Sequence, residues 1–208
     1  MYAGERFNTY SHLSGLILAA AGLMLMLLKT IGHGDGYRIF SVSVYGISLL
    51  LLYLSSSLYH GIAAGKLKSI LKKTDHCMIY VLIAGSYTPF ALVSLRNGPG
   101  WTVFSLSWLL AAAGIAQELT IGRKSEKRLL SIAIYIVMGW MVLAVMKSLT
   151  ASLPPAGLAW LAAGGMLYSV GIYWFVNDEK IRHGHGIWHL FVLGGSITQF
   201  VSVYGYVI

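Results

Sequence analysis

The chain has 208 residues, of which 57% are hydrophobic and only 11% are charged, and its formal net charge is +8. Soluble domains carry roughly a quarter charged residues, so this composition excludes an ordinary soluble enzyme and favours an integral membrane protein. A basic balance can also indicate a nucleic-acid-binding protein, but here the Lys and Arg residues do not gather on one soluble face. We therefore expect membrane lipids, and no nucleic acid, as the partners of this chain.

Seven apolar stretches follow one another along the chain, each close to the roughly 17–25 residues that span a bilayer as a helix. The predicted helices cover approximately residues 10–28, 40–60, 75–95, 101–118, 129–146, 157–176 and 186–207. The expected fold is an all-α bundle of seven transmembrane helices, a single integral membrane domain over residues 1–208. The first stretch is interpreted as a retained helix rather than a signal peptide, because Glu5 offsets its one basic residue, Arg6, and no soluble domain follows.

The basic residues divide unevenly between the two sides of such a bundle. Eleven of the fifteen belong to the N-terminus and to the second, fourth and sixth loops, and the other four are Lys29, Arg38, Arg96 and Lys147. The positive-inside rule then predicts a cytoplasmic N-terminus and an extracytoplasmic C-terminus in the plasma membrane. This orientation is inverted relative to G-protein-coupled receptors and argues against that class.

Three histidines form the best candidate metal site. His60 closes the second apolar stretch, and His185 and His189 open the seventh. Residues four apart share one helix face, so His185 and His189 can point at one ion, and the predicted orientation puts all three on the cytoplasmic side. Three His ligands with an open position are typical of a catalytic zinc. The alternative for each is a histidine at the level of the lipid headgroups.

Asp75 and Ser56 are the candidate catalytic residues beside these ligands. Asp75 opens the third predicted helix on the same side and could orient a ligand or hydrogen-bond a water on the metal; alternatively it is a helix N-cap. Ser56 lies one turn before His60, or it is a small residue that eases helix packing. The remaining histidines were assigned elsewhere: His76 to headgroups or a neighbouring helix, and His183 and His33 to loops.

A second polar cluster opens the first helix. Glu5, Asn8 and His12 fall at i, i+3 and i+7 on one face, with Ser11 beside them. The cluster is either an interfacial entry to the helix or a polar lining at the cytoplasmic mouth of the bundle, and His12 could compete as a metal ligand.

Three further features concern packing. Pro89 lies inside the third predicted helix and should kink it. Gln117 and Glu118 end the fourth and are most simply interfacial. Cys77, the one cysteine, rules out an internal disulfide framework.

The motifs together resemble the bacterial hemolysin III family. They are Glu5-x-x-Asn8-x-x-Ser11-His12-x-x-Gly15, Ser56-x-x-x-His60 with Asp75 downstream, and His185-x-x-x-His189. That family belongs with the progestin and adipoQ receptors, in a wider group that includes alkaline ceramidases, and the resemblance covers essentially the whole chain. It implies zinc near the cytoplasmic leaflet, held by His60, His185 and His189, with Asp75 and Ser56 around the metal-bound water. The chain lacks the long N-terminal region of the animal receptors, so an adipokine-receptor role is not expected.

The expected function is zinc-dependent hydrolysis of a lipid amide such as a ceramide, by resemblance to the ceramidases. The main alternative is a non-enzymatic role in membrane homeostasis or sensing, with zinc as a structural staple. Membrane permeabilisation, implied by the family name, ranks third. The sequence gives neither the substrate nor the oligomeric state.

Overall fold

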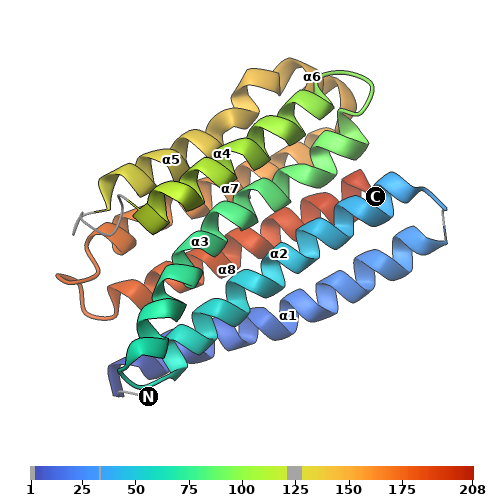
Figure 1. Cartoon of the computed structure of the whole chain (residues 1–208). Coiled ribbons are helices and arrows are strands. Elements are labelled where there is room, and N and C mark those ends of the chain that lie inside the picture. The colour runs from blue at the N-terminus through green and yellow to red at the C-terminus, as the bar shows by residue number, and fades with distance from the viewer. Residues whose placement is uncertain (1–2, 33, 121–127) are drawn as a thin grey trace.

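The computed structural model describes residues 3–32, 34–120 and 128–208, and every regular element within these ranges is helical (Figure 1). The elements in chain order are η1 (Ala3–Glu5), α1 (Arg6–Ile31), α2 (Gly36–Gly61), α3 (Lys66–Pro89), η2 (Phe90–Ser94), α4 (Gly100–Thr120), α5 (Leu129–Trp140), η4 (Met141–Val145), α6 (Met146–Ser152), α7 (Pro155–Val176), α8 (Gly184–Ser202) and η5 (Val203–Val207). They form seven segments in the described residues that are long and apolar enough to cross a membrane. The predicted all-α class with seven spans is confirmed.

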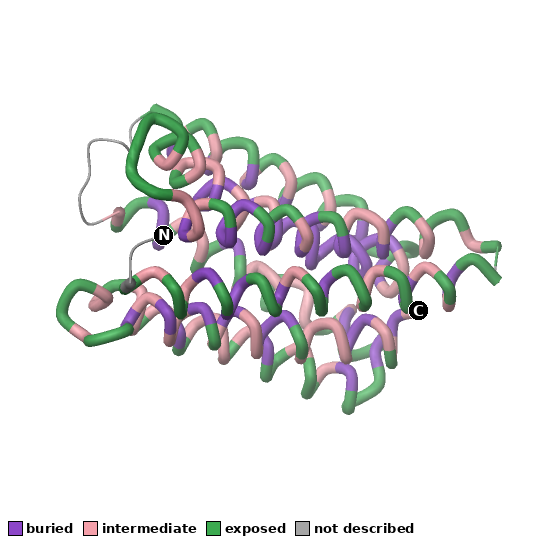
Figure 2. The backbone as a smooth tube through the Cα atoms, turned by 90° about the horizontal axis from the view of Figure 1, so that it is seen from below, coloured by how far each residue is buried: buried purple, intermediate pink, exposed green. Residues whose placement is uncertain are grey.

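The helices run side by side along one common direction, and the two chain ends lie at opposite ends of the bundle (Figure 1). In sequence order α1 packs on α2, α2 on α3 and α3 on α4, while α8 packs on both α7 and α1. The fifth span, α5 to α6, makes fewer contacts with its neighbours. Buried residues face the inside of the bundle and exposed apolar residues face outward, as a lipid-facing surface requires (Figure 2).

Buried tyrosines give the bundle a polar centre. The hydroxyls of Tyr53 and Tyr168 lie 2.8 and 2.9 Å from the Ser196 hydroxyl, and Tyr45 lies 3.5 Å from the Ser196 carbonyl. A tyrosine hydroxyl buried among apolar helices needs a partner, and Ser196 of α8 supplies it for two tyrosines of α2 and one of α7. This network fixes α8 against α2 and α7. The three histidines of the candidate site lie on α2 and α8.

The fifth span is broken at its centre, where α5 gives way to the 3-10 turn η4. The Tyr87 hydroxyl, from α3, accepts from the Val142 N–H at 2.9 Å and lies 2.9 Å from the carbonyl oxygens of Met138 and Gly139. A helix can be interrupted at membrane depth only where the freed backbone groups find partners. Tyr87 provides that partner here.

The third helix differs from expectation at both ends. It begins at Lys66, earlier than the predicted residue 75, so Asp75 lies inside the helix and is not its N-cap. At its other end Pro89 is followed by the π-helical turn η2, because a proline has no N–H to continue the ladder and its ring crowds the preceding turn. A kink was predicted at Pro89, and the distortion found there is this π turn.

The start of η1, the α2–α3 and α7–α8 connections, the end of α4 and the start of α5 lie at the same end of the bundle. These are the positions that hold most of the basic residues, and their assignment to the cytoplasm stays a prediction. Arg123, Lys124 and Lys127, which are among these basic residues, lie outside the described residues, as does His33, which was expected in a loop.

Candidate metal centre

Three histidines meet at the end of the bundle that holds the N-terminus. His60 is the penultimate residue of α2, and His185 and His189 lie in the first two turns of α8. Their ring centroids are 4.8 to 5.0 Å apart, and one possible ligand atom from each lies within 4.8 Å of the others. Nitrogens on one zinc ion lie about 2.0–2.1 Å from it, so small side-chain rotations would close the set. These three residues could hold a metal ion.

Carboxylates hold two of the three imidazoles through Nδ1. His60 Nδ1 lies 2.6 Å from Glu5 Oε2, and His185 Nδ1 lies 2.8 Å from Asp178 Oδ2. Burial raises the pKa of Glu5, but the hydrogen bonds from His60 and Asn8 and the nearby charges of His60 and Lys68 together outweigh it, so the pKa lies below its ordinary value. The hydrogen bond from His185 likewise lowers the pKa of Asp178. Because an ionised carboxylate only accepts, Nδ1 carries the proton in both rings and Nε2 is left to bind a metal.

The third imidazole is held by the backbone of α1. His189 Nδ1 lies 3.1 Å from both the Asn8 carbonyl oxygen and the Ser11 hydroxyl. This contact requires α1 to approach α8 closely, and Gly186 permits it: a Cβ at that position would collide with the Phe7 ring. The sequence motif that opens α1 therefore supplies partners for imidazoles that could hold a metal ion.

The free nitrogens suit a metal ion. Nε2 of His60 is buried and has no hydrogen-bond partner among the described residues. Leaving such a group unsatisfied costs about 1–3 kcal/mol, and a bound cation would remove that cost. Neutral imidazoles with Nδ1 donating to a carboxylate or carbonyl are the arrangement that metal-binding histidines adopt. The donor set of three nitrogens fits zinc.

Asp75 and Ser56 share one cavity with two of the three histidines. Asp75 is 9% exposed and lines the cavity together with Ser56, His185 and His189. The Ser56 hydroxyl lies beside the Asp75 carboxyl group. The structure thus brings every site residue that the sequence singled out to the same end of the bundle.

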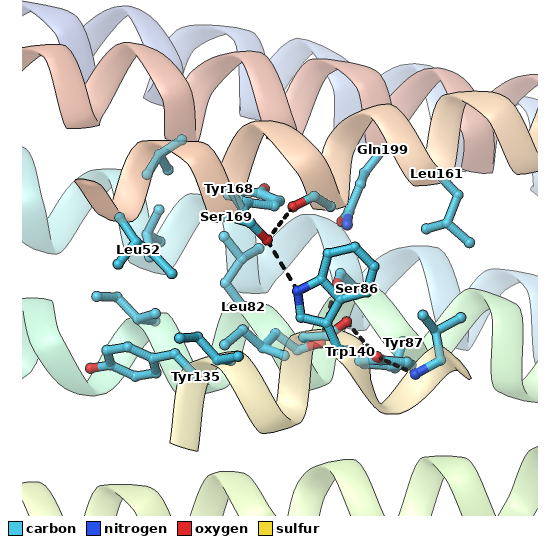
Figure 3. A pocket seen from close by; sticks show the side chains of 18 of the residues that line it. Leu52, Leu82, Ser86, Tyr87, Tyr135, Trp140, Leu161, Tyr168, Ser169 and Gln199 are labelled. Atoms are coloured by element: carbon cyan, nitrogen blue, oxygen red, sulfur yellow. Dashed lines mark hydrogen bonds between the residues drawn. The ribbon is translucent and has the colours of Figure 1, made fainter. Parts of the chain in front are cut away.

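The cavity extends from this polar end deep into the bundle. Its volume is about 310 Å³, and its walls come mainly from apolar side chains of α3, α5, α7 and α8 (Figure 3). Leu82, Tyr87 and Leu161 line it, and Trp140 of α5 bonds Ser169 of α7 at 3.1 Å beside it. From His185 to Gln199, both in the wall, α8 rises about 21 Å at 1.5 Å per residue. A cavity of this length and polarity suits a hydrocarbon chain with a polar end group.

His12 is next to the three candidate ligands but is not one of their group. Its ring stacks on that of His189 at 3.5 Å between centroids and lines the cavity, but it is not in the group of ligand atoms that could share one ion. The expectation that His12 could compete as a ligand is not supported by this geometry.

The sequence missed a buried charge network next to the site. Glu118, expected at the interface, is 5% exposed, and its carboxylate is 2.9 Å from Arg128, 2.7 Å from Ser131 and 3.3 Å from His76. The network joins the ends of α3, α4 and α5. An acidic residue within an apolar helix was the available signal, since such groups usually face the bundle interior.

Comparison with known proteins shows the family of this chain. A family model described as Haemolysin-III related matches residues 2–200. The chain belongs to the haemolysin-III-related family. It is 41% identical over 204 residues to "Hemolysin-3" of Bacillus cereus, covering 98% of this chain and 92% of that protein. It is 42% identical over 202 residues to the "Hemolysin-3 homolog" of Bacillus subtilis strain 168, covering 97% and 93%.

A more distant human relative is "Monocyte to macrophage differentiation factor", 29% identical over 210 residues, covering 96% of this chain and 82% of that protein. Similar proteins therefore occur in both bacteria and humans. The expected resemblance to a wider group of proteins is consistent with this. With seven apolar spans, the chain is a multi-pass membrane protein of this family.

Removing the carboxylate behind His60 should weaken metal binding. We expect Glu5→Ala to lower the affinity for zinc by about 10- to 100-fold, the usual effect of losing a group that orients a metal ligand. Competition against a chromophoric chelator measures this affinity. Glu179→Ala is the matched control, because Glu179 is an exposed acid in the α7–α8 connection; it should change nothing. Equal affinity in the two variants would contradict the role of Glu5.

Proposed function

We propose that this chain is a zinc-dependent hydrolase of lipid amides of the ceramide type, acting from the cytoplasmic leaflet with its N-terminus in the cytoplasm. The observation that carries the proposal is the meeting of three metal-competent imidazoles with Asp75 and Ser56 at the polar end of a long apolar cavity. The resemblance to the alkaline ceramidases supplies the reaction class.

Each part of the cavity has a chemical task in this proposal. Zinc held by His60, His185 and His189 would polarise the amide carbonyl and lower the pKa of a water molecule at the site. Asp75 takes the proton of the attacking water and passes it to the leaving nitrogen. Ser56 lies beside Asp75 and would orient its carboxyl group. The apolar walls bind the acyl chain and keep bulk water away from the reacting carbonyl.

A structural metal is the second candidate, and one observation favours it. The ligands come from α2 and α8, so a zinc there would tie two helices that are distant in sequence. Such a staple would suit a homeostasis or sensor protein and needs no substrate.

The two candidates differ in a hydrolysis assay. Purified protein, chelator-stripped protein and zinc-restored protein are incubated with a panel of ceramides and other N-acyl lipids, and free fatty acid is quantified. The hydrolase predicts release that disappears on stripping and returns with zinc. No metal-dependent release across a broad panel would refute it and leave the structural role.

A further inference from the structure

His12 is the one imidazole of the site whose ring nitrogens the surrounding protein does not use. It is 4% exposed, and both Nδ1 and Nε2 are buried without a hydrogen-bond partner among the described residues. A buried polar group without a partner is destabilising and calls for an explanation. The three neighbouring histidines each have Nδ1 bonded, so His12 differs from them.

The neighbours of His12 cannot supply the missing partner. On one face lies the His189 ring, stacked at 3.5 Å with an interplanar angle of 12°. The Tyr53 ring meets it edge-on at 5.1 Å, and the Tyr53 hydroxyl is already bonded to Ser196 at 2.8 Å. The remaining side of His12 forms part of the cavity wall, next to His189, Ser56 and Asp75. Its nitrogens are therefore available to whatever occupies the polar end of the cavity.

The chemistry of a neutral imidazole limits what that occupant offers. In either tautomer one ring nitrogen accepts a hydrogen bond and the other donates one. A secondary amide carries both a donor N–H and an acceptor C=O, whereas an ester carries no donor. With the carbonyl directed to the metal, the amide N–H is the group left to seek an acceptor in the wall.

We propose that His12 accepts a hydrogen bond from the N–H of a bound secondary amide, and so makes the site select amide-linked over ester-linked acyl lipids. This inference rests on the proposed function, which takes the cavity as the lipid site and the metal as the partner of the carbonyl. It adds a specificity-determining residue outside the set of metal ligands and catalytic groups. A site built to bond a donor disfavours ligands that lack it, because its own buried acceptor is then left unpaired.

The test compares three matched lipids that share one acyl chain and one headgroup and differ only in the link: a secondary amide, its N-methyl amide and an ester. Binding to the full chain is measured by displacement of a fluorescent fatty acid. The protein is measured first as purified, at times too short for hydrolysis, and again after chelator treatment. Wild type should bind the secondary amide about tenfold more tightly than the other two, the usual strength of one net hydrogen bond.

Variants of His12 assign the preference. His12→Phe keeps a ring to stack on His189 but has no nitrogen, so it should bind all three lipids equally, with zinc content unchanged. His12→Gln keeps an acceptor and should retain part of the preference. Ser14→Ala is the control, since Ser14 lies on the same helix with an exposed side chain.

The outcomes separate this inference from the function beneath it. Equal binding of all three lipids by wild type, or an unchanged amide preference in His12→Phe, overturns the role of His12 and leaves the lipid site standing. No binding of any of the three by wild type overturns the lipid site and the inference together. The wild-type comparison needs no variant, so it decides the matter even where His12→Phe does not fold.

Discussion

His60→Ala and His189→Ala are each expected to purify without zinc, whereas wild type should carry about one zinc per chain, the stoichiometry of a single three-histidine site. Both side chains are nearly inaccessible, at 3% and 2% exposure, and no other imidazole of the described residues lies in the group that could share the ion. Asp75 and Ser56 cannot replace the lost imidazole, because neither belongs to the group of side chains whose ligand atoms could share one ion. Metal content is measured by mass spectrometry of the purified protein.

The control for this loss is His183→Asn. His183 precedes α8, its ring contacts that of Phe7, and its carbonyl accepts from the Ile187 N–H at 2.9 Å, a bond that Asn keeps. Its φ is positive at 60°, which Asn tolerates. It should keep its zinc. Undiminished zinc in both His60→Ala and His189→Ala would remove the proposed site.

Asp75→Asn should keep zinc and the fold while hydrolysing lipid amides about 10²–10⁴-fold more slowly, the usual effect of a lost general base. The reason is geometric: Asp75 lines the cavity with the histidines but is outside the group of metal ligand atoms. Its loss therefore removes proton transfer without removing a ligand. Fatty-acid release, zinc content and thermal unfolding are measured on the same preparation.

The matched control is Asp35→Asn at the opposite end of the bundle. Asp35 caps α2 by accepting from the Tyr37 N–H at 2.9 Å, and Asn is an equally good cap, so activity should not change. A structural zinc predicts a different pattern. Metal removal would then lower the melting temperature strongly, Asp75→Asn would have little effect, and no lipid amide would be cleaved.

The sequence predicted the parts of this molecule that depend on local pattern. The apolar stretches predicted the seven spans because each must fill the bilayer by itself. His185 and His189 were paired by helical spacing, and the basic loops brought His60 to the same side. These inferences require only one helix, or one side of the membrane, at a time.

What the sequence could not predict arises from contacts between helices. The pairing of Glu5 with His60 depends on how η1 approaches the end of α2, and that of Asp178 with His185 on how the α7–α8 connection approaches α8. The motif at the start of α1 suggested a shared face but not its partner. Asp178 was overlooked because it lies in a polar loop, where an acid usually faces water.

The start of the third helix was missed for a related reason. Residues 66–74 include several lysines, so hydropathy placed the start of the predicted helix at residue 75, whereas the helix begins at Lys66. Hydropathy reports the membrane-spanning part of a helix and not its full length. Glu118 was misplaced because the sequence does not reveal that Arg128, Ser131 and His76 surround it.

The most direct test of the central claim is X-ray absorption at the zinc edge of the purified, detergent-solubilised chain. The geometry predicts three imidazole nitrogens at about 2.0–2.1 Å and one further light-atom ligand, with no sulfur. His60→Ala should abolish the signal. A spectrum with a sulfur ligand, or with fewer than three imidazoles, would show that zinc binds elsewhere and contradict the assignment of His60, His185 and His189.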